Sequence, residues 1–103
     1  GSRSLIQRLA DNTAYFRKGL KDLGFTVPES VHPIVPVMLF DARLAGAFAA
    51  RMLELGVYVV AFSYPVVPKD KARIRTQVSA GHTKEDLDFA LSCFEQVKKE
   101  LMG

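Results

Sequence analysis

The sequence predicts an α/β domain of the α+β kind, in which a small, mostly antiparallel sheet carries helices on one face. Three observations lead to this fold class. Apolar residues recur at helical spacing in three separate segments, two strand-like segments follow one another without a helix between them, and residues 72–78 alternate between inward- and outward-facing side chains. The resulting order is helix, strand, helix, strand, strand, helix, which fits two packed layers.

Composition limits the chain to one globular domain. The 103 residues are 49% hydrophobic and 24% charged, enough for a single core. No apolar run approaches the roughly 20 residues that span a bilayer, and no secretory signal segment opens the chain, so we expect no membrane partner. Gly1 and Ser2 are interpreted as a remnant of tag cleavage, which places the domain at residues 3–103.

Charge and cysteine content exclude further classes of protein. The net charge of +3 is spread along the chain and does not demand a nucleic-acid partner. Cys93 is the single cysteine, so an internal disulfide is impossible, and His32 and His82 add no zinc-binding spacing. We expect no metal site, and we expect Cys93 to lie in the core.

The first helix is predicted from Ser4 to about Leu23, where Gly24 ends it. Charged residues, Arg17 among them, are assigned to the polar faces of this helix. Residues 25–27, before Pro28, are expected to form a short edge strand. The apolar stripe of the helix consists of Leu5, Leu9, Phe16, Leu20 and Leu23.

The next strand is expected at residues 34–39, where Pro36 restricts it to an edge or to a position that needs no ladder hydrogen bond. Asp41 is expected to cap the helix that follows, and Gly56 to end it. The buried stripe of this helix is predicted to be Leu44, Phe48, Met52 and Leu55.

Two strands joined by a long loop form the centre of the predicted fold. Residues 57–62 are continuously apolar, as in a strand that is covered on both faces. The alternation in residues 72–78 places Arg73 and Arg75 on one face. The loop at residues 63–71 is longer than a usual hairpin loop and is stiffened by two prolines, which suggests that it presents a binding surface.

The last helix is predicted to begin at Thr83, with Asp86 completing a capping box, and to run to about Leu101. Its stripe is Leu87, Ala90, Leu91, Phe94, Val97 and Leu101.

Two stretches resemble a known family. F-S-Y-P-V-V-P-K-x-K-A-R-I-R-T-Q-V-S-A-x-H-T at residues 62–83, and H-P-I-V-P-V-M-L-x-D-A-R-L-A at residues 32–45, are similar to the C-terminal segment of glycine C-acetyltransferases (2-amino-3-ketobutyrate CoA ligases). These enzymes are pyridoxal-phosphate-dependent α-oxoamine synthases. The resemblance implies the C-terminal small domain of a fold-type I transferase, whose complete form condenses glycine with acetyl-CoA to give 2-amino-3-ketobutyrate and CoA in threonine breakdown.

The resemblance also implies cofactor, assembly and location. Pyridoxal phosphate is expected in the complete enzyme, held mainly by a preceding domain, and none is expected on this chain, which offers no Schiff-base lysine in a pocket-like context. The complete enzyme is expected to be a homodimer, mitochondrial in a eukaryote and cytoplasmic in a bacterium. Phe40 and Asp70 stand where the family pattern has glycine, so each is expected to be strained if the family's positive φ is kept.

Arg75 is the main candidate for a binding residue. A strand-borne guanidinium presents a rigid planar fork that matches a carboxylate, although such an arginine can also be a solvated or ion-paired surface residue. In the resembled family the second arginine of the A-R-I-R motif binds the carboxylate of the amino-acid substrate, and that position is Arg75. Arg73 and His82 are expected to support the surrounding loops.

The long loop is a second candidate. Its residues either pack simply or, by the resemblance, shape the approach of acyl-CoA; they are Tyr64, Pro65, Val66, Val67, Pro68 and Lys69. The resemblance leaves open another α-oxoamine synthase. On the residues alone, the chain could also be a stand-alone module whose basic hairpin binds RNA or another polyanion, or a purely structural or oligomerising domain. RNA-binding sheets generally stack bases on aromatic side chains, and we expect no aromatic residue on the face of Arg73 and Arg75, which argues against RNA binding.

Overall fold

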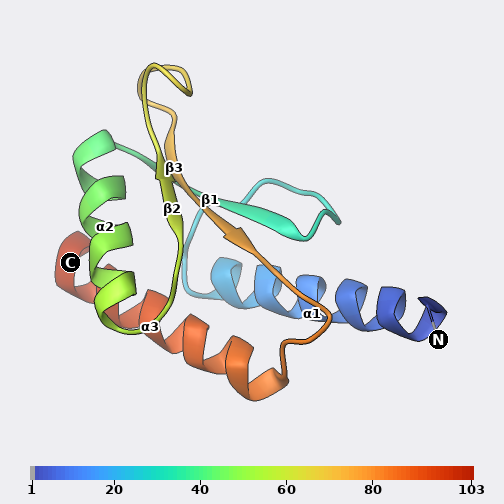
Figure 1. Ribbon diagram of the computed structural model, residues 1–103. Helices are drawn as coiled ribbons and strands as arrows, with labels where there is room; N and C mark the ends of the chain where they lie inside the picture. The colour runs from blue at the N-terminus through green and yellow to red at the C-terminus, as the bar shows by residue number, and fades with distance from the viewer. Residues whose placement is uncertain (1) are drawn as a thin grey trace.

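The computed structural model describes residues 2–103, and its elements follow the predicted order (Figure 1). Gly1 lies outside the described residues, so the proposed tag remnant is not tested. The elements are α1 (Ser2–Asp22), β1 (Ile34–Phe40), α2 (Ala42–Glu54), β2 (Val60–Phe62), β3 (Ala72–Gln77) and α3 (Lys84–Met102).

The sheet is fully antiparallel, with strand order β1-β3-β2, so the last strand in the chain lies at its centre. β1 is an edge strand, which accommodates Pro36 as predicted. The short strand expected at residues 25–27 is wrong: only Thr26 forms an isolated bridge, in which its carbonyl accepts from the Met38 N–H at 2.9 Å. One bridge is too little to continue the ladder.

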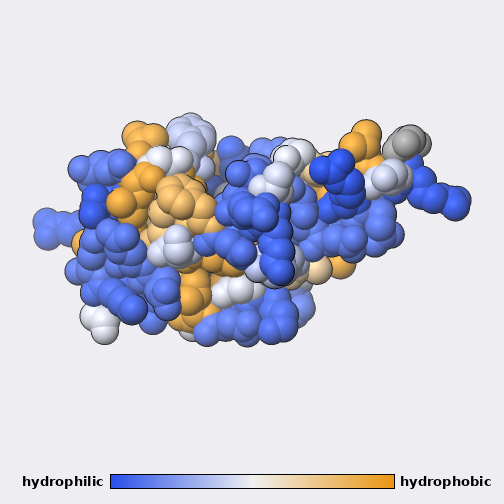
Figure 2. Space-filling model, turned by 90° about the horizontal axis from the view of Figure 1, so that it is seen from below, coloured by the Kyte–Doolittle hydropathy of each residue, from blue (hydrophilic) through white to orange (hydrophobic). Residues whose placement is uncertain are grey.

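The helices form one layer on one face of this sheet (Figure 1). α2 lies against all three strands, α3 packs against α2, and α1 packs against α3. Seen from below, the surface is largely hydrophilic, with an apolar area in the left half of the view (Figure 2). No described element covers the opposite face of the sheet, which we call the open face.

The core lies between the sheet and the helices. Val35, Val37 and Ile74 are fully buried from the sheet side, and Cys93 is buried as predicted. Four phenylalanines from the helices and from the segment after α1 meet with ring centroids 5.6 to 6.1 Å apart, most of them edge to face. They are Phe16, Phe25, Phe48 and Phe94.

Local capping contacts explain where the later helices begin. An Asp41 carboxylate oxygen accepts from the Leu44 N–H at 3.0 Å, which makes Asp41 the predicted N-cap of α2. Thr83 and Asp86 form the predicted capping box, in which each side chain accepts from the other residue's backbone N–H. Both caps satisfy donors that helices leave unpaired.

The predicted stripes are too long at their outer ends. Leu5 is 55% and Leu101 41% exposed, whereas Leu44 and Leu55 are half-buried and pack against the core as predicted. Leu5 and Leu101 lie near the outer ends of α1 and α3, where the apolar spacing continues although the side chains are exposed.

Two further expectations about burial are wrong. Residues 57–62 are not covered on both faces: β2 is a three-residue edge strand, Tyr58 is 78% exposed, and only Val59 is buried. One side of the run faces the helices, whereas the other side belongs to the open face and is apolar without being covered. Arg17 is 6% exposed rather than on a polar face, and the Ser30 carbonyl, in the segment after α1, accepts from its Nη1.

Phe40 and Asp70 keep the positive φ that the family pattern implies, with φ of 70° and 62°. Both residues carry a Cβ in the left-handed region, which costs free energy relative to glycine. At Phe40 the sheet register also shifts, since a bulge lies between Met38 and Phe40.

Candidate functional site on the open sheet face

The alternation of β3 builds the candidate site. Ala72, Ile74 and Thr76 are buried toward the helices, which turns Arg73 and Arg75 onto the open face as predicted.

Apolar residues flank Arg75 on both sides. In the register of the sheet it lies opposite Pro36 of β1 and opposite Val60 of β2. A guanidinium among apolar neighbours interacts more strongly with an anion once the site is covered, because the local dielectric constant falls.

The guanidinium of Arg75 has one described partner, and that partner is not an acid. Its central carbon lies 5.0 Å from the centroid of the Phe62 ring, an arrangement typical of a cation–π contact. Across residues 2–103, no carboxylate forms an ion pair with Arg75 and no acceptor takes a hydrogen bond from its side chain. The N–H fork therefore remains available for a ligand.

Arg73 is arranged differently. Its Nε donates a hydrogen bond of 3.1 Å to the Lys71 carbonyl, at the point where the long loop enters β3. The residue is half-buried and lies opposite Met38 and Phe62. Part of its fork is thus engaged by its own backbone, and the supporting role assigned to Arg73 stays a prediction.

The loop at residues 63–71 projects beyond the end of the sheet (Figure 1). A turn stabilises its start, since the Ser63 carbonyl accepts from the N–H groups of Val66 and Val67 at 3.0 and 3.2 Å. Tyr64 and Val66 are exposed, and the Lys69 ammonium lies 5.6 Å from the centroid of the Tyr64 ring. The loop thus offers apolar and basic groups to a partner, while no described contact joins it to Arg75.

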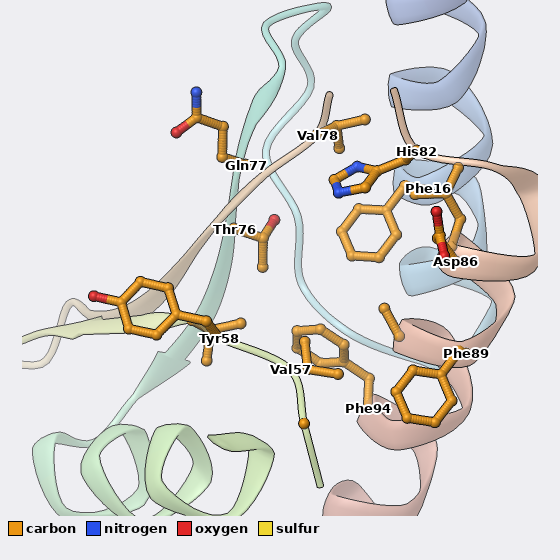
Figure 3. A pocket seen from close by; sticks show the side chains of 14 residues that line it. Phe16, Val57, Tyr58, Thr76, Gln77, Val78, His82, Asp86, Phe89 and Phe94 are labelled. Atoms are coloured by element: carbon orange, nitrogen blue, oxygen red, sulfur yellow. The ribbon is translucent and has the colours of Figure 1, made fainter. Parts of the chain in front are cut away.

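His82 lies at a separate place, a cavity of about 450 Å³ beyond the end of β3 (Figure 3). Its Nδ1 accepts a 3.0 Å hydrogen bond from the Ser79 N–H, the kind of loop contact expected for this ring. Phe16 and Phe94 line the cavity from the core, and Tyr58 lines it from the segment before β2. Neither Arg75 nor the long loop takes part, so the structure does not bring the candidate residues into one pocket.

The aromatic residue on the open face was missed. Phe62 belongs to β2 but faces the same side as Arg73 and Arg75, so the expectation of a face without aromatic residues is wrong. Local alternation along β3 contains no information about the neighbouring strand; only the register of β2 against β3 shows it. The available indication was that residues 57–62 and 72–78 are predicted as consecutive strands, so alternate residues of the apolar run share the face of Arg75 if the two strands pair.

The carboxyl groups of Glu100 and Asp86 have a lowered pKa, and both lie in contacts that stabilise the helices rather than in the candidate site. Hydrogen bonds from Arg51 and then from Gln96 lower the pKa of Glu100 from 4.5 to about 2, and this contact joins α2 to α3. The capping hydrogen bonds of Thr83 lower the pKa of Asp86. Neither acid contacts Arg75.

Comparison with known proteins places the chain in a family. The chain belongs to the aminotransferase class I and II family, whose model matches residues 3–94. Relatives with similar sequences narrow the family to the α-oxoamine synthases. It is 53% identical over 96 residues to the 8-amino-7-oxononanoate synthase of Thermosipho melanesiensis and 50% identical over 97 residues to the mitochondrial 2-amino-3-ketobutyrate coenzyme A ligase of Homo sapiens. These alignments cover 93% and 94% of the chain, but only 25% and 23% of the two relatives.

Solved structures confirm the fold class. A structure of SPT with PLP superposes with a TM-score of 0.94 at 27% identity, covering 98% of this chain and 26% of that one. The serine palmitoyltransferase of Sphingomonas wittichii gives a TM-score of 0.91 at 27% identity, covering 96% of this chain and 25% of that one. The chain thus has the fold of a segment of PLP enzymes and spans about a quarter of their length.

The residues of this chain do not fit the cofactor itself. Pyridoxal phosphate requires a Schiff-base lysine in a pocket and an acid near its ring nitrogen. No lysine lines the 450 Å³ cavity, and Lys18 and Lys21, which line a second cavity of about 320 Å³, form ion pairs with Asp22 and Glu29. We therefore assign no cofactor step to these residues. Within residues 2–103, no three His, Cys, Asp or Glu side chains cluster as metal ligands, and no helix is long and apolar enough to cross a membrane.

Proposed function

We propose that this chain is the C-terminal, substrate-contacting segment of a pyridoxal-phosphate-dependent α-oxoamine synthase that condenses glycine with acetyl-CoA. In this proposal Arg75 binds the carboxylate of the amino-acid substrate. The chain supplies this anchor, and the cofactor chemistry resides in parts of the complete protein that the chain does not contain.

The state of Arg75 supports the proposal most directly. The side chain is exposed on a rigid central strand, its fork has no acid partner among residues 2–103, and its immediate neighbours are apolar. A surface arginine can also remain solvated without any partner, so the absence of an acid matters here only together with the rigid strand and the apolar neighbours. An unpaired, oriented fork suits two parallel N–H bonds to a substrate carboxylate.

Two members of the family compete for the identity of the substrates. The Y-P-V-V-P and A-R-I-R-T-Q stretches favour the glycine and acetyl-CoA member, whereas the 53% identity to an 8-amino-7-oxononanoate synthase favours a member that uses another amino acid and acyl-CoA. CoA release by the complete enzyme, assayed with each substrate pair, decides between them. A preference for glycine and acetyl-CoA in kcat/KM supports the proposal, and a preference for the other pair contradicts it.

The loop from Tyr64 to Lys69 is proposed to shape the approach of acyl-CoA. Exposed Tyr64 and Val66 offer apolar surface, while Lys69 offers a positive charge that suits a phosphate. In the complete enzyme, Lys69→Gln should raise the KM for acetyl-CoA and leave the glycine dissociation constant unchanged.

Assembly and location follow the same proposal. The complete enzyme is proposed to be a homodimer, and the mitochondrial name of the human relative suggests that compartment for a eukaryotic enzyme and the cytoplasm for a bacterial one. Light scattering on the complete enzyme tests the dimer.

Substitution of Arg75 in the complete enzyme tests the central assignment. Charge-assisted hydrogen bonds contribute about 1.5–3 kcal/mol each, so Arg75→Ala and Arg75→Lys should weaken glycine binding at least about tenfold. Lysine fails because one ammonium cannot make two parallel bonds. Absorbance of the bound cofactor during a glycine titration gives the dissociation constant, and acetyl-CoA binding is the internal control.

Arg73→Ala is the matched control, since Arg73 shares strand and face but donates to the Lys71 carbonyl. It should have the smaller effect. Normal glycine binding by Arg75→Ala, together with a large loss in Arg73→Ala, would show that the wrong arginine has been assigned.

A further inference from the structure

We propose that Phe62 is a positioning residue, whose ring fixes the direction of the Arg75 fork toward the substrate carboxylate. The inference rests on the proposed function of Arg75 and assigns a determinant of amino-acid affinity to β2, a strand that itself provides no polar group to the site.

The sheet register places the two residues as diagonal neighbours. Phe62 lies directly opposite Arg73, and Arg75 is two residues further along β3 on the same face. The guanidinium carbon of Arg75 nevertheless lies over the Phe62 ring, 5.0 Å from its centroid. Diagonal pairs across an antiparallel ladder are within reach of long and aromatic side chains, so the contact follows from the register.

Among the described residues, the Phe62 ring is the contact that holds the Arg75 guanidinium. An arginine has a long, flexible side chain, and it binds a carboxylate more tightly when its guanidinium is already held in the binding orientation before the ligand arrives. For Arg73 a backbone carbonyl does part of this ordering. For Arg75 the flanking residues Pro36 and Val60 offer no acceptor side chain, which leaves the face of Phe62.

A ring under a guanidinium also leaves the right atoms free. A cation–π contact is not a hydrogen bond to an acceptor, so it need not occupy the N–H bonds, which point outward in the plane of the guanidinium. Phe62 can thus orient Arg75 without competing for the donors that bind a carboxylate. An acidic partner would have held the arginine as firmly but would have occupied those donors.

The test compares aromatic and non-aromatic residues at position 62 in the complete enzyme. Phe62→Leu should raise the glycine dissociation constant and the KM for glycine roughly two- to fivefold, the size of a cation–π contact at a partly exposed site. The KM for acetyl-CoA should not change, and Phe62→Tyr should restore the original values because it keeps the ring. Phe62→Ile is a second non-aromatic variant if Phe62→Leu is unstable.

Tyr58→Leu is the matched control, because Tyr58 precedes the same strand, is 78% exposed and has no described contact with Arg75. It should bind glycine normally. The double variant Phe62→Leu/Arg75→Lys gives a second control: if the ring acts through Arg75, removing it should add little once Arg75 is replaced.

The outcomes separate the two levels of the proposal. If Arg75→Lys weakens glycine binding while Phe62→Leu does not, or if the two effects simply add, the role of Phe62 is refuted and the role of Arg75 stands. If neither variant affects glycine binding, the proposed function itself fails. A loss in Phe62→Leu that Phe62→Tyr rescues, and that disappears in the Arg75→Lys background, supports the inference.

Discussion

The positive φ of Phe40 allows a sharp test of backbone strain in the 103-residue chain. With φ of 70°, a Cβ at this position costs about 1–2 kcal/mol in the native state. Glycine avoids that cost but loses about 0.4–1 kcal/mol more conformational entropy on folding. Phe40→Gly should therefore be more stable than Phe40→Ala by about 1 kcal/mol, although glycine is normally the less stable of the two.

Comparing two substitutions at one position is necessary because Phe40 does more than adopt a strained φ. The side chain is 44% exposed, so more than half of it is in contact with the protein, and Phe40→Gly alone would mix relief of strain with loss of packing. Glycine and alanine both remove the ring, which leaves the backbone as their main difference. The same comparison at Asp70, with φ of 62° and an exposed side chain, should give the same order with a simpler background.

Thermal unfolding followed by circular dichroism measures the difference. One kcal/mol corresponds to roughly 4–8 °C in Tm for a domain of this size. Ala50→Gly, on the exposed side of helix α2, is the control and should lower stability by about 1 kcal/mol. Alanine equal to or better than glycine at both Phe40 and Asp70 would refute the strain argument.

Three further predictions concern the scaffold. Gly19→Ala should destabilise the chain by about 1 kcal/mol despite the better helix propensity of alanine, because its Cβ would lie 2.5 Å from Leu91 Cδ1; in a Leu91→Ala background the substitution should become stabilising. Arg17→Met should raise Tm, because two buried guanidinium nitrogens, Nε and Nη2, have no hydrogen-bond partner among the described residues and a buried cation is costly; an equal or lower Tm would show that the cation is compensated. The lowered pKa of Glu100 means that its contribution to stability is present above its ordinary pKa of 4.5 and is lost as the pH falls toward about 2; Glu100→Gln should flatten the acid dependence of Tm in that interval, and an unchanged dependence would contradict it.

The features that could be predicted from the sequence are those that depend on residues close together in the chain. The alternation from Ala72 to Val78 placed Arg75 on the correct face, and the Asp41 and Thr83 caps were found because capping depends on neighbouring residues. The errors concern contacts between distant segments. The apolar run at residues 57–62 resembles a doubly covered strand, because periodicity cannot distinguish a face covered by a helix from an apolar face left open.

The candidate site shows the same division. The face on which Arg75 lies could be predicted from its own strand, and its binding role stays a prediction, whereas its contact with Phe62 depends on the register of β2 against β3, which no local pattern specifies. Arg17 was misplaced for a related reason: its side chain is buried and donates to the Ser30 carbonyl in the segment after α1, a contact that the helical period does not specify.

The strand order described above has a consequence for how the chain acquires its structure during synthesis. Apart from the single bridge between Thr26 and Met38, both edge strands pair with β3 alone, so as a ribosome releases the chain neither β1 nor β2 has its native strand partner until residues 72–77 emerge. Until then β1 and β2 are apolar segments whose backbone N–H and C=O groups are mostly unpaired, which favours association with other chains. A nascent chain that stalls between β2 and β3 therefore exposes both strands without their shared partner, and completion of a single six-residue segment pairs one edge of each.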